Sequence, residues 1–177
     1  NFHPRELWLG DGPINSELER LLTQAQAAGM RIVRFHAGDE FDYGGLNFRV
    51  LAPSLDSLSS SARANDDSLV MTVGYKNTSA LLEGDAEKLA ESRITSEHPA
   101  AQLLKVAHHG SVNSTSSALL AAIHPKYASI SVGVRNPYGH PRMEVLERLA
   151  AAGVATYRTD LDGAVTFYLD GNDVIPR

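Results

Sequence analysis

The sequence predicts a single domain of the α/β class, in which strands and helices pack in layers. Of its 177 residues, 43% are hydrophobic and 21% are charged, a composition typical of one globular domain with a buried core. Short apolar segments with the pattern of strands alternate with amphipathic helical segments through most of the chain. A run of strands closes the sequence, without an internal repeat. This order of elements is typical of a layered α/β fold that occupies residues 1–177.

The first elements are expected to form a β-α-β unit and then a hairpin. ELWLG predicts a strand, and PINSELERLLTQAQAAG predicts a helix that Asn15 or Ser16 caps and Gly29 ends. RIVRF predicts the second strand. In DEFDYGGLNFRVLAP, the pair Gly44 and Gly45 predicts the turn of a β-hairpin. The segment SLDSLSSSARANDD, rich in Ser and Asp, predicts a surface loop.

Strands and helices alternate in the rest of the chain. SLVMTVGYKNTSALLEGD predicts two strands around a turn at Lys76, AEKLAESRI a helix, and QLLKVA a strand that runs into two adjacent histidines. STSSALLAAI predicts a helix with Ser114 or Thr115 as its cap. KYASISVG predicts a strand, and MEVLERLAAAG a helix that ends at Gly153. ATYRT, GAVTFYL and DVIP predict the last strands.

The composition limits the ligands that the chain can bind. It has 16 Lys and Arg residues against 21 Asp and Glu residues, a formal charge of −5, so no broad basic surface for phosphate backbones is indicated. The absence of cysteine excludes disulfides and thiolate metal sites. A metal would therefore be bound by His, Asp or Glu, which suit zinc, manganese or iron. No apolar run approaches the roughly 18 residues of a membrane span, and no signal peptide is recognisable. The start of the sequence, NFHPRELWLGDG, predicts a piece of a longer protein.

Three predicted strands end abruptly in polar residues that can bind metal. ALLEGD ends at Asp85, LLKVAHHGS contains His108 and His109, and ASISVGVRNPYGHP leads to His140. In layered α/β folds, ligands bind beyond the carboxyl ends of the strands. If the three ends converge, one carboxylate and up to three imidazoles share an edge, where they form an oxygen and nitrogen site for a divalent ion.

Each of these residues also has a structural interpretation. Asp85 could cap the helix AEKLAESRI, where its carboxylate would accept hydrogen bonds from free amides. His108 and His109 could form a polar turn, and Ser111 could belong to a loop. His140 lies in NPYGHP, whose proline, glycine and asparagine residues predict a turn. The three strand ends together favour the functional interpretation. The other histidines are expected to be structural or to lie in loops: His3, His36, His98 and His124.

The motifs GD, HHGS, NPYGHP and YRTDLDG, in this order, resemble the metallo-β-lactamase-like domain of the competence DNA-uptake channel protein ComEC. The resemblance extends from about Asn65 to Phe167. It implies a metallo-β-lactamase-like αββα sandwich with a metal-dependent site along its edge. The principal metal motif of that superfamily, H-x-H-x-D-H, is absent from these 177 residues. The chain is therefore expected to lack the N-terminal strands and the first metal motif of the fold.

The resemblance also implies roles for individual residues. Asp85 would bridge two divalent ions, manganese or zinc, and His140 would line the same site as a ligand or a catalytic residue. Adjacent residues of an extended chain point to opposite sides, so only one of His108 and His109 is expected to be a direct ligand, and His109 is favoured. His108 would then act on the substrate.

Two serines and one glutamate complete the expected site. Ser111 and Ser114, near the start of a helix, are expected to contact phosphate. Glu83 stands where the family usually has threonine, and it would add negative charge near the site.

The function that the resemblance implies is a metal-dependent phosphodiesterase that acts on DNA. It would degrade the strand that is not carried into the cell, as part of a membrane channel protein at the extracytoplasmic face of the bacterial inner membrane. One alternative is a non-catalytic domain with a structural or docking role in the channel. Another is hydrolysis of a small phosphodiester or a lactone, which the same residues could perform.

Overall fold

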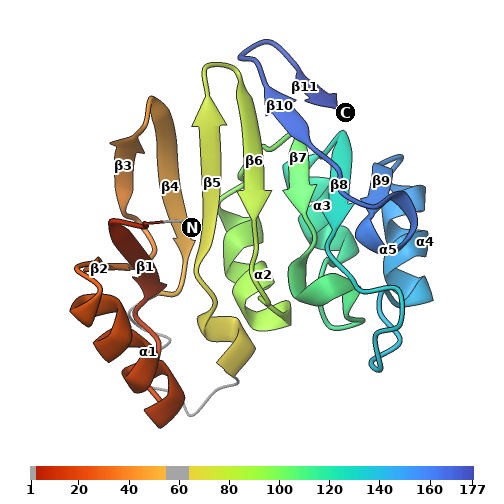
Figure 1. The fold of residues 1–177 in the computed structure, drawn as a ribbon. Helices are drawn as coiled ribbons and strands as arrows, with labels where there is room; N and C mark the ends of the chain where they lie inside the picture. The colour runs from red at the N-terminus through yellow and green to blue at the C-terminus, as the bar shows by residue number, and fades with distance from the viewer. Residues whose placement is uncertain (1–2, 55–63) are drawn as a thin grey trace.

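A computed structural model describes residues 3–54 and 64–177, and a seven-stranded mixed sheet forms its centre (Figure 1). The strand order is β3-β4-β5-β6-β7-β8-β9. Strands β3 to β6 pair antiparallel, and strands β6 to β9 pair parallel. The expected α/β class is confirmed. The strands are β3 (Glu40–Tyr43), β4 (Leu46–Ala52), β5 (Val70–Tyr75), β6 (Thr78–Leu82), β7 (Leu103–Lys105), β8 (Tyr127–Ile130) and β9 (Ala155–Arg158).

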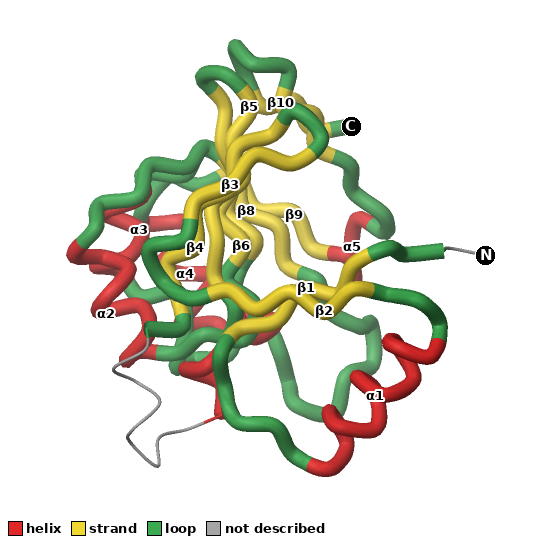
Figure 2. The backbone as a smooth tube through the Cα atoms, turned by 90° about the vertical axis from the view of Figure 1, so that its left-hand side faces the viewer, coloured by secondary structure: helices red, strands yellow, loops and turns green. Residues whose placement is uncertain are grey.

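Three helices cover one face of this sheet (Figure 2). Helices α2 (Lys88–Ser96), α3 (Ser117–Ile123) and α4 (Met143–Ala151) each connect two neighbouring parallel strands. Because such crossovers are right-handed and the strand order advances in one direction, the three helices lie on the same face. The main core lies between them and the sheet, and each large apolar side chain buried there stabilises the fold by about 1.5–3 kcal/mol. Its fully buried members include Leu81, Ile94, Leu104, Leu119, Ile123, Ile130 and Leu149.

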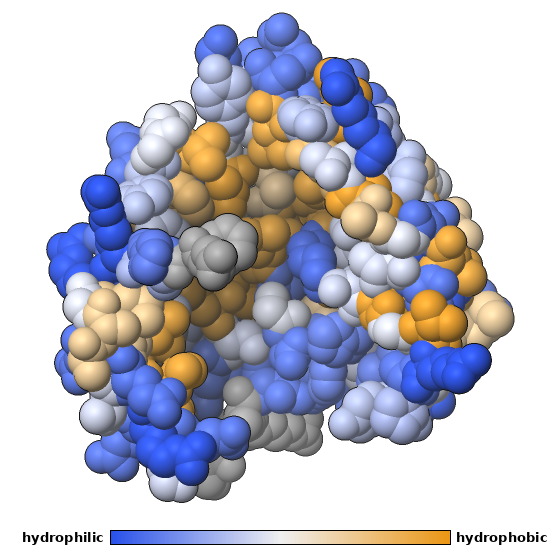
Figure 3. All heavy atoms as spheres, viewed as in Figure 1, coloured by the Kyte–Doolittle hydropathy of each residue, from blue (hydrophilic) through white to orange (hydrophobic). Residues whose placement is uncertain are grey.

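The opposite face carries two smaller units. Strands β1 (Glu6–Gly10) and β2 (Arg31–Phe35) pair parallel and are joined by helix α1 (Ser16–Ala27), which confirms the expected β-α-β unit. Trp8 packs edge-to-face on Phe48 of β4, with ring centroids 5.3 Å apart. The hairpin of β10 (Phe167–Leu169) and β11 (Val174–Pro176) packs on the other end of the sheet. Between these two units the face is hollowed and apolar (Figure 3).

Of the layers expected for an αββα sandwich, the described residues form one helical layer and one large sheet. The hairpin turn at Gly44 and Gly45 and the turn at Lys76 are also where the sequence predicts them. A short helix not expected from the sequence, α5 (Thr159–Asp162), follows β9.

The strand before the two histidines is shorter than predicted. β7 ends at Lys105, and residues Ala107–Gly110 form a 3₁₀ turn, η3. In this turn His108 has φ 44° and His109 has φ 55°, so both residues are left-handed. The argument that an extended backbone points the two side chains to opposite sides is therefore wrong. Their orientation is set by hydrogen bonds to other segments.

The predicted cap of α1 is confirmed, whereas the predicted cap of α3 is wrong. Asn15 caps α1 as one of the two predicted candidates, since its Oδ1 accepts a hydrogen bond of 2.8 Å from the amide of Leu18. Helix α3 is capped by Ser116, whose Oγ accepts from the amide of Leu119 at 3.2 Å. The predicted caps Ser114 and Thr115 lie earlier in the chain and are fully buried. The Ser114 hydroxyl contacts the carbonyls of Ala107 and Ser111, and the Thr115 hydroxyl has no hydrogen-bond partner within the described residues.

Asp66, not Asp85, caps helix α2. Residues 55–63 of the expected surface loop lie outside the described residues, and Ala64–Asp67 form a 3₁₀ turn, η2. The buried Asp66 accepts hydrogen bonds at Oδ1 from the amides of Glu87 (3.2 Å) and Ala90 (3.0 Å). Asp85 is exposed, and within the described residues its carboxylate accepts no hydrogen bond. The cap interpretation of Asp85 is therefore wrong.

We predict that Asp66→Ala lowers the free energy of unfolding of this chain by about 1–2 kcal/mol, the usual cost of a lost N-cap. The substitution leaves two buried amides without an acceptor, and urea denaturation measures the loss. Asp85→Ala is the control and should change stability by less than about 0.5 kcal/mol, as expected for an exposed residue. An equal loss from both variants would show that Asp85 also supports the helix.

Candidate active site at the strand ends

The parallel strands bring the predicted site residues to one edge of the sheet. Leu82, Lys105 and Ser129 lie side by side in β6, β7 and β8, so the segments that follow these strands leave the sheet together. The amide of His108 donates a hydrogen bond of 3.0 Å to the carbonyl of Gly84, which joins the histidine turn to the segment before Asp85. The expected convergence is thus present for the strand ends.

The three imidazoles are neighbours at this edge. The ring centroid of His108 lies 5.8 Å from that of His140 and 6.4 Å from that of His109. His108 and His140 are partly buried, whereas His109 is exposed. The three rings therefore belong to one site, with His108 in the middle.

His109 is oriented by a backbone carbonyl. Its Nδ1 lies 2.7 Å from the carbonyl oxygen of Ser131. A carbonyl oxygen can only accept a hydrogen bond, so Nδ1 carries the proton and Nε2 has a free lone pair. A shallow pocket beside the ring is lined by Ser131, Val132, Gly133 and Thr159. This arrangement is typical of a histidine that binds a ligand through Nε2.

His140 is held by the side chain of Asn136. The amide of His140 donates to Asn136 Oδ1 at 2.9 Å, and Asn136 Nδ2 donates to the carbonyl of His140 at 2.8 Å. Within the described residues, Nδ1 of His140 is buried without a hydrogen-bond partner. Burial is the main cause that lowers the pKa of His140, and the neighbouring His108 and Arg142 lower it further. At neutral pH the ring is therefore neutral, the form that can bind a cation.

Gly110 allows the loop that carries His140 to approach the histidine turn. Its φ is 83°, and a Cβ atom at this position would lie 2.5 Å from Cβ of Pro141. The amide of Arg142 donates to the Gly110 carbonyl at 2.9 Å. The close contact that the glycine permits is therefore with the backbone and ring of Pro141.

The segment from His109 to Ser116 is tied to helices on both sides. Glu91 of α2 accepts hydrogen bonds from the amides of Thr115 and Ser116. Arg148 of α4 donates to the carbonyls of Ser114 (3.2 Å) and Val112 (3.1 Å). These contacts fix the end of the segment that follows the histidines.

The two serines expected to bind phosphate lie in this segment. Ser114 is fully buried, and its hydroxyl lies 3.1 Å from the carbonyl of Ala107 and 2.9 Å from that of Ser111. Ser111 is 7% exposed, and its Oγ accepts a long hydrogen bond from the amide of Asn113. The phosphate contact of both residues stays a prediction, and the geometry gives Ser114 a structural partner instead.

Two glutamates of the site were not recognised from the sequence as contacts of the histidine segment: Glu87 and Glu91. Glu87 Oε1 lies 3.2 Å from Nδ1 of His108. Both glutamates lie in AEKLAESRI, which reads only as an amphipathic helix. The one signal that could have found them is their spacing of four residues, which places both carboxylates on one side of the helix.

Glu83 is buried directly beside the site. It is fully buried, and within the described residues neither of its carboxylate oxygens has a hydrogen-bond partner. Burial and the nearby charge of Glu91 raise the pKa of Glu83 well above its ordinary value. The expectation that Glu83 adds negative charge near the site applies only above that raised pKa.

The described residues do not by themselves fit a complete metal centre. The unpaired Nδ1 of His140 and the free Nε2 of His109 are donors that suit zinc or manganese. However, no group of three or more His, Asp or Glu side chains in residues 3–54 and 64–177 is arranged to hold an ion. The expected ligands Asp85, His109 and His140 are therefore at one edge without forming a coordination shell.

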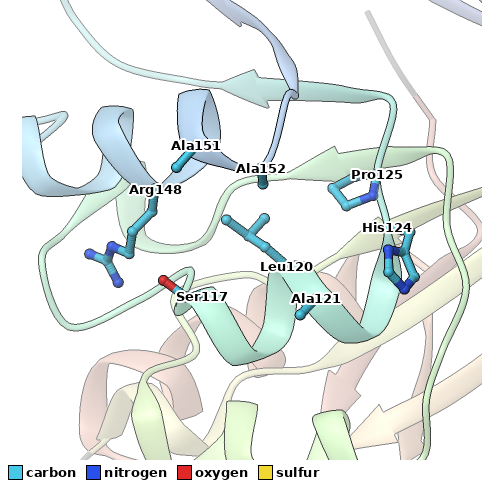
Figure 4. A pocket seen from close by; sticks show the side chains of 8 residues that line it. All are labelled: Ser117, Leu120, Ala121, His124, Pro125, Arg148, Ala151 and Ala152. Carbon is cyan, nitrogen blue, oxygen red and sulfur yellow. The ribbon is translucent and has the colours of Figure 1, made fainter.

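A second pocket lies away from the strand ends, between α3 and α4 (Figure 4). None of the predicted site residues lines it. Its lining consists of Ser117, Leu120, Ala121, His124, Pro125, Arg148, Ala151 and Ala152. Its apolar walls and its place on the helical side separate it from the histidine site.

The sequence is similar to part of three competence and recombination proteins. It is 34% identical over 151 residues to ComE operon protein 3 of Bacillus subtilis. The aligned region covers 84% of this chain and 19% of that protein. Competence protein ComA of Neisseria gonorrhoeae is 33% identical over 139 residues (77% of this chain, 20% of that protein). Recombination protein 2 of Haemophilus influenzae is 37% identical over 130 residues (73% and 16%). The chain thus spans about a fifth of the length of these relatives. No family model matches the sequence.

Solved structures with the same fold have much lower sequence identity. A protein described as a metal-dependent hydrolase, from Parabacteroides distasonis, matches with a TM-score of 0.52 at 10% identity. The match covers 88% of this chain and 64% of the chain of that protein. A variant of the CmlA β-hydroxylase has a TM-score of 0.56 at 10% identity (86% and 38%). The metallo-β-lactamase fold protein YhfI of Bacillus subtilis has a TM-score of 0.51 at 8% identity (85% and 62%). The fold is therefore that of the metallo-β-lactamases.

No helix within the described residues is long and apolar enough to cross a membrane.

We predict that Glu83→Gln stabilises the chain increasingly as the pH rises. Because the folded protein holds the Glu83 proton more tightly than the unfolded chain, whose carboxyl pKa is near 4.5, the stability that Glu83 contributes is fully present below that value. It is lost as the pH rises through the raised pKa of the folded state. Thermal denaturation from mildly acidic to alkaline pH, with a chelator present, should show a smaller decline for Glu83→Gln than for the wild type.

The control for this prediction is Glu147→Gln on the exposed side of α4. This substitution removes an exposed carboxylate of the same chemical type, so the pH profile of the variant should follow the wild type. A parallel profile for Glu83→Gln would contradict the raised pKa.

Proposed function

This chain is a homologue of one segment of the ComEC family of competence proteins, and we propose that it forms part of a metal-dependent phosphodiesterase that cleaves DNA. The observation that carries the proposal is the gathering of His108, His109 and His140 at the strand ends, next to the Gly84–Asp85 segment. Neutral imidazoles beside a carboxylate are the donor types of hydrolytic metal sites.

We assign metal binding to Asp85, His109 and His140, and the handling of protons to His108, with His140 as a second candidate. The assignment is supported by the free Nε2 of His109 and the unpaired Nδ1 of His140, each of which can donate a lone pair. A complete centre needs more donors than the described residues bring together. We propose two manganese or zinc ions once such donors are present.

The choice of DNA as substrate is supported by the relatives. Two of them are named for competence and one for recombination. The formal charge of −5 fits a module that cleaves DNA better than one that holds it, because a long-lived grip on phosphates needs an excess of basic residues. We propose that the substrate strand is the one not carried into the cell, and that the domain acts at the extracytoplasmic face of the inner membrane within a channel protein.

A second candidate function is a non-catalytic domain that docks other parts of the channel. It is favoured by one observation, the absence of a complete ligand group in residues 3–54 and 64–177. Substitution of a site residue distinguishes the two candidate functions. In an enzyme the substitution abolishes hydrolysis, whereas a docking domain has no hydrolytic activity before or after the substitution.

We predict that the 177-residue chain alone binds manganese or zinc weakly, with a Kd no tighter than about 10 μM, which corresponds to a binding free energy of about −7 kcal/mol. Asp85 and the histidines are too few to complete two coordination shells. Isothermal titration calorimetry on the chelator-treated chain measures the affinity. Tight binding of two ions per chain would show that the described residues form a fuller centre than their geometry indicates.

We predict that Asp85→Asn and His140→Ala each lower hydrolysis of a DNA substrate by the full-length protein at least about a hundredfold, the scale expected for a lost ligand or proton donor. The melting temperature should hardly change for Asp85→Asn, because this side chain is exposed. Turnover of a labelled oligonucleotide is the measurement.

The control for these variants is His124→Ala. This residue also precedes a proline, but it ends helix α3 and lines the pocket between α3 and α4 (Figure 4). Its activity should equal that of the wild type. Full activity in both site variants would remove Asp85 and His140 from the catalytic site.

A further inference from the structure

We propose that Glu87 is a positioning residue that fixes the tautomer of His108, so that Nδ1 carries the proton and Nε2 presents a free lone pair to the site. Glu87 lies directly before the first turn of α2, and His108 lies in the turn after β7. The two residues are 21 positions apart and meet only because α2 returns the chain to the neighbouring parallel strand.

Two polar groups compete for Nδ1 of His108. Glu87 Oε1 lies 3.2 Å away, and the amide nitrogen Nδ2 of Asn65 lies 3.5 Å away. The carboxylate can only accept a hydrogen bond from Nδ1, whereas the amide group can only donate to it. The two contacts therefore require opposite tautomers of the same ring.

The carboxylate is the stronger of the two partners. The 3.5 Å contact is at the outer limit of a hydrogen bond, and the Asn65 amide already donates to Glu87 Oε1 at 3.1 Å. A hydrogen bond to an ionised carboxylate is also about twice as strong as one between neutral groups. The proton therefore resides on Nδ1 and faces Glu87.

The surroundings keep Glu87 in place for this contact. Its side chain is only 12% exposed. Its amide is fixed by Asp66, and its Oε1 accepts from Asn65. A carboxylate held on several sides can orient a ring without losing much conformational entropy.

The consequence is an unprotonated Nε2 next to His140. Within the described residues Nε2 of His108 has no hydrogen-bond partner, and the His140 ring centroid is 5.8 Å from that of His108. Such a nitrogen can accept a hydrogen bond or a proton from a molecule bound at the strand ends. Its use in catalysis rests on the proposed function, whereas the tautomer itself does not.

Nitrogen NMR of the ring resonances tests the proposal on the metal-free 177-residue chain, at a pH where the rings are neutral. In the wild type, the His108 signals should show a protonated Nδ1 and an unprotonated Nε2. In Glu87→Ala, the population should shift to the tautomer with the proton on Nε2, which isolated histidine favours. Glu87→Gln keeps the size of the side chain and should show a smaller shift in the same direction, so the test does not depend on the alanine variant folding.

Asn65→Ala is the matched control, since it removes the other polar neighbour of Nδ1. It should keep the tautomer of the wild type. A proton on Nε2 in the wild type, or an unchanged tautomer in a folded Glu87→Ala or Glu87→Gln variant, would overturn the proposal.

Kinetics of the full-length protein separate this proposal from the proposed function. If DNA is the substrate, Glu87→Gln should lower kcat about 10- to 100-fold with KM unchanged, the effect expected for the loss of a residue that orients another one at a site. If the full-length protein does not hydrolyse DNA, the proposed function is wrong. The NMR measurement of the His108 tautomer then still tests whether Glu87 positions that ring. An unchanged kcat beside a shifted tautomer would show that His108 does not need its Nε2 lone pair for the reaction, which also overturns the positioning role.

Discussion

The geometry of the site depends on two carboxylates of the α2 region that hold residues 107–116 in an unfavourable backbone conformation. His108 and His109 are both left-handed, which costs about 1–2 kcal/mol for each residue that is not glycine. Glu87 binds the side chain of the first histidine, and Glu91 binds two backbone amides at the far end of the segment. Each hydrogen bond to a charged group contributes about 1.5–3 kcal/mol, so together these contacts offset the strain. The contact of His109 Nδ1 with the carbonyl of Ser131 orients the second ring.

The topology explains why these contacts are possible. Strands β6, β7 and β8 are parallel, so each ends at the same edge, and each connecting helix begins there. The start of α2 therefore lies beside the end of β7, with its two glutamates one turn apart. Asp66, which precedes β5 and β6 in the sequence, caps the start of α2 and anchors it. The same connection that builds the core places the acceptors next to the histidine turn.

Burial shifts the pKa of several groups at the strand ends in the direction that favours their neutral forms. It lowers the pKa of His140 and of Lys105 and raises that of Glu83. The neutral form of His140 has a free lone pair, which a protonated ring lacks. Within the described residues, the side chains at the strand ends form no group of three or more donors that could hold a cation.

The sequence by itself determined the α/β class, the first β-α-β unit, the hairpin at Gly44 and the three strand ends that carry the candidate site residues. These features follow from local patterns, because apolar periodicity and turn residues act over a few positions. Only the tertiary structure decided that Asp66 caps α2, that the histidine turn is left-handed, and that Glu87 orients His108. Each of these depends on a hydrogen bond between residues about 20 positions apart. Such a bond is specified by how the strands and helices pack, and no local pattern of the sequence encodes it.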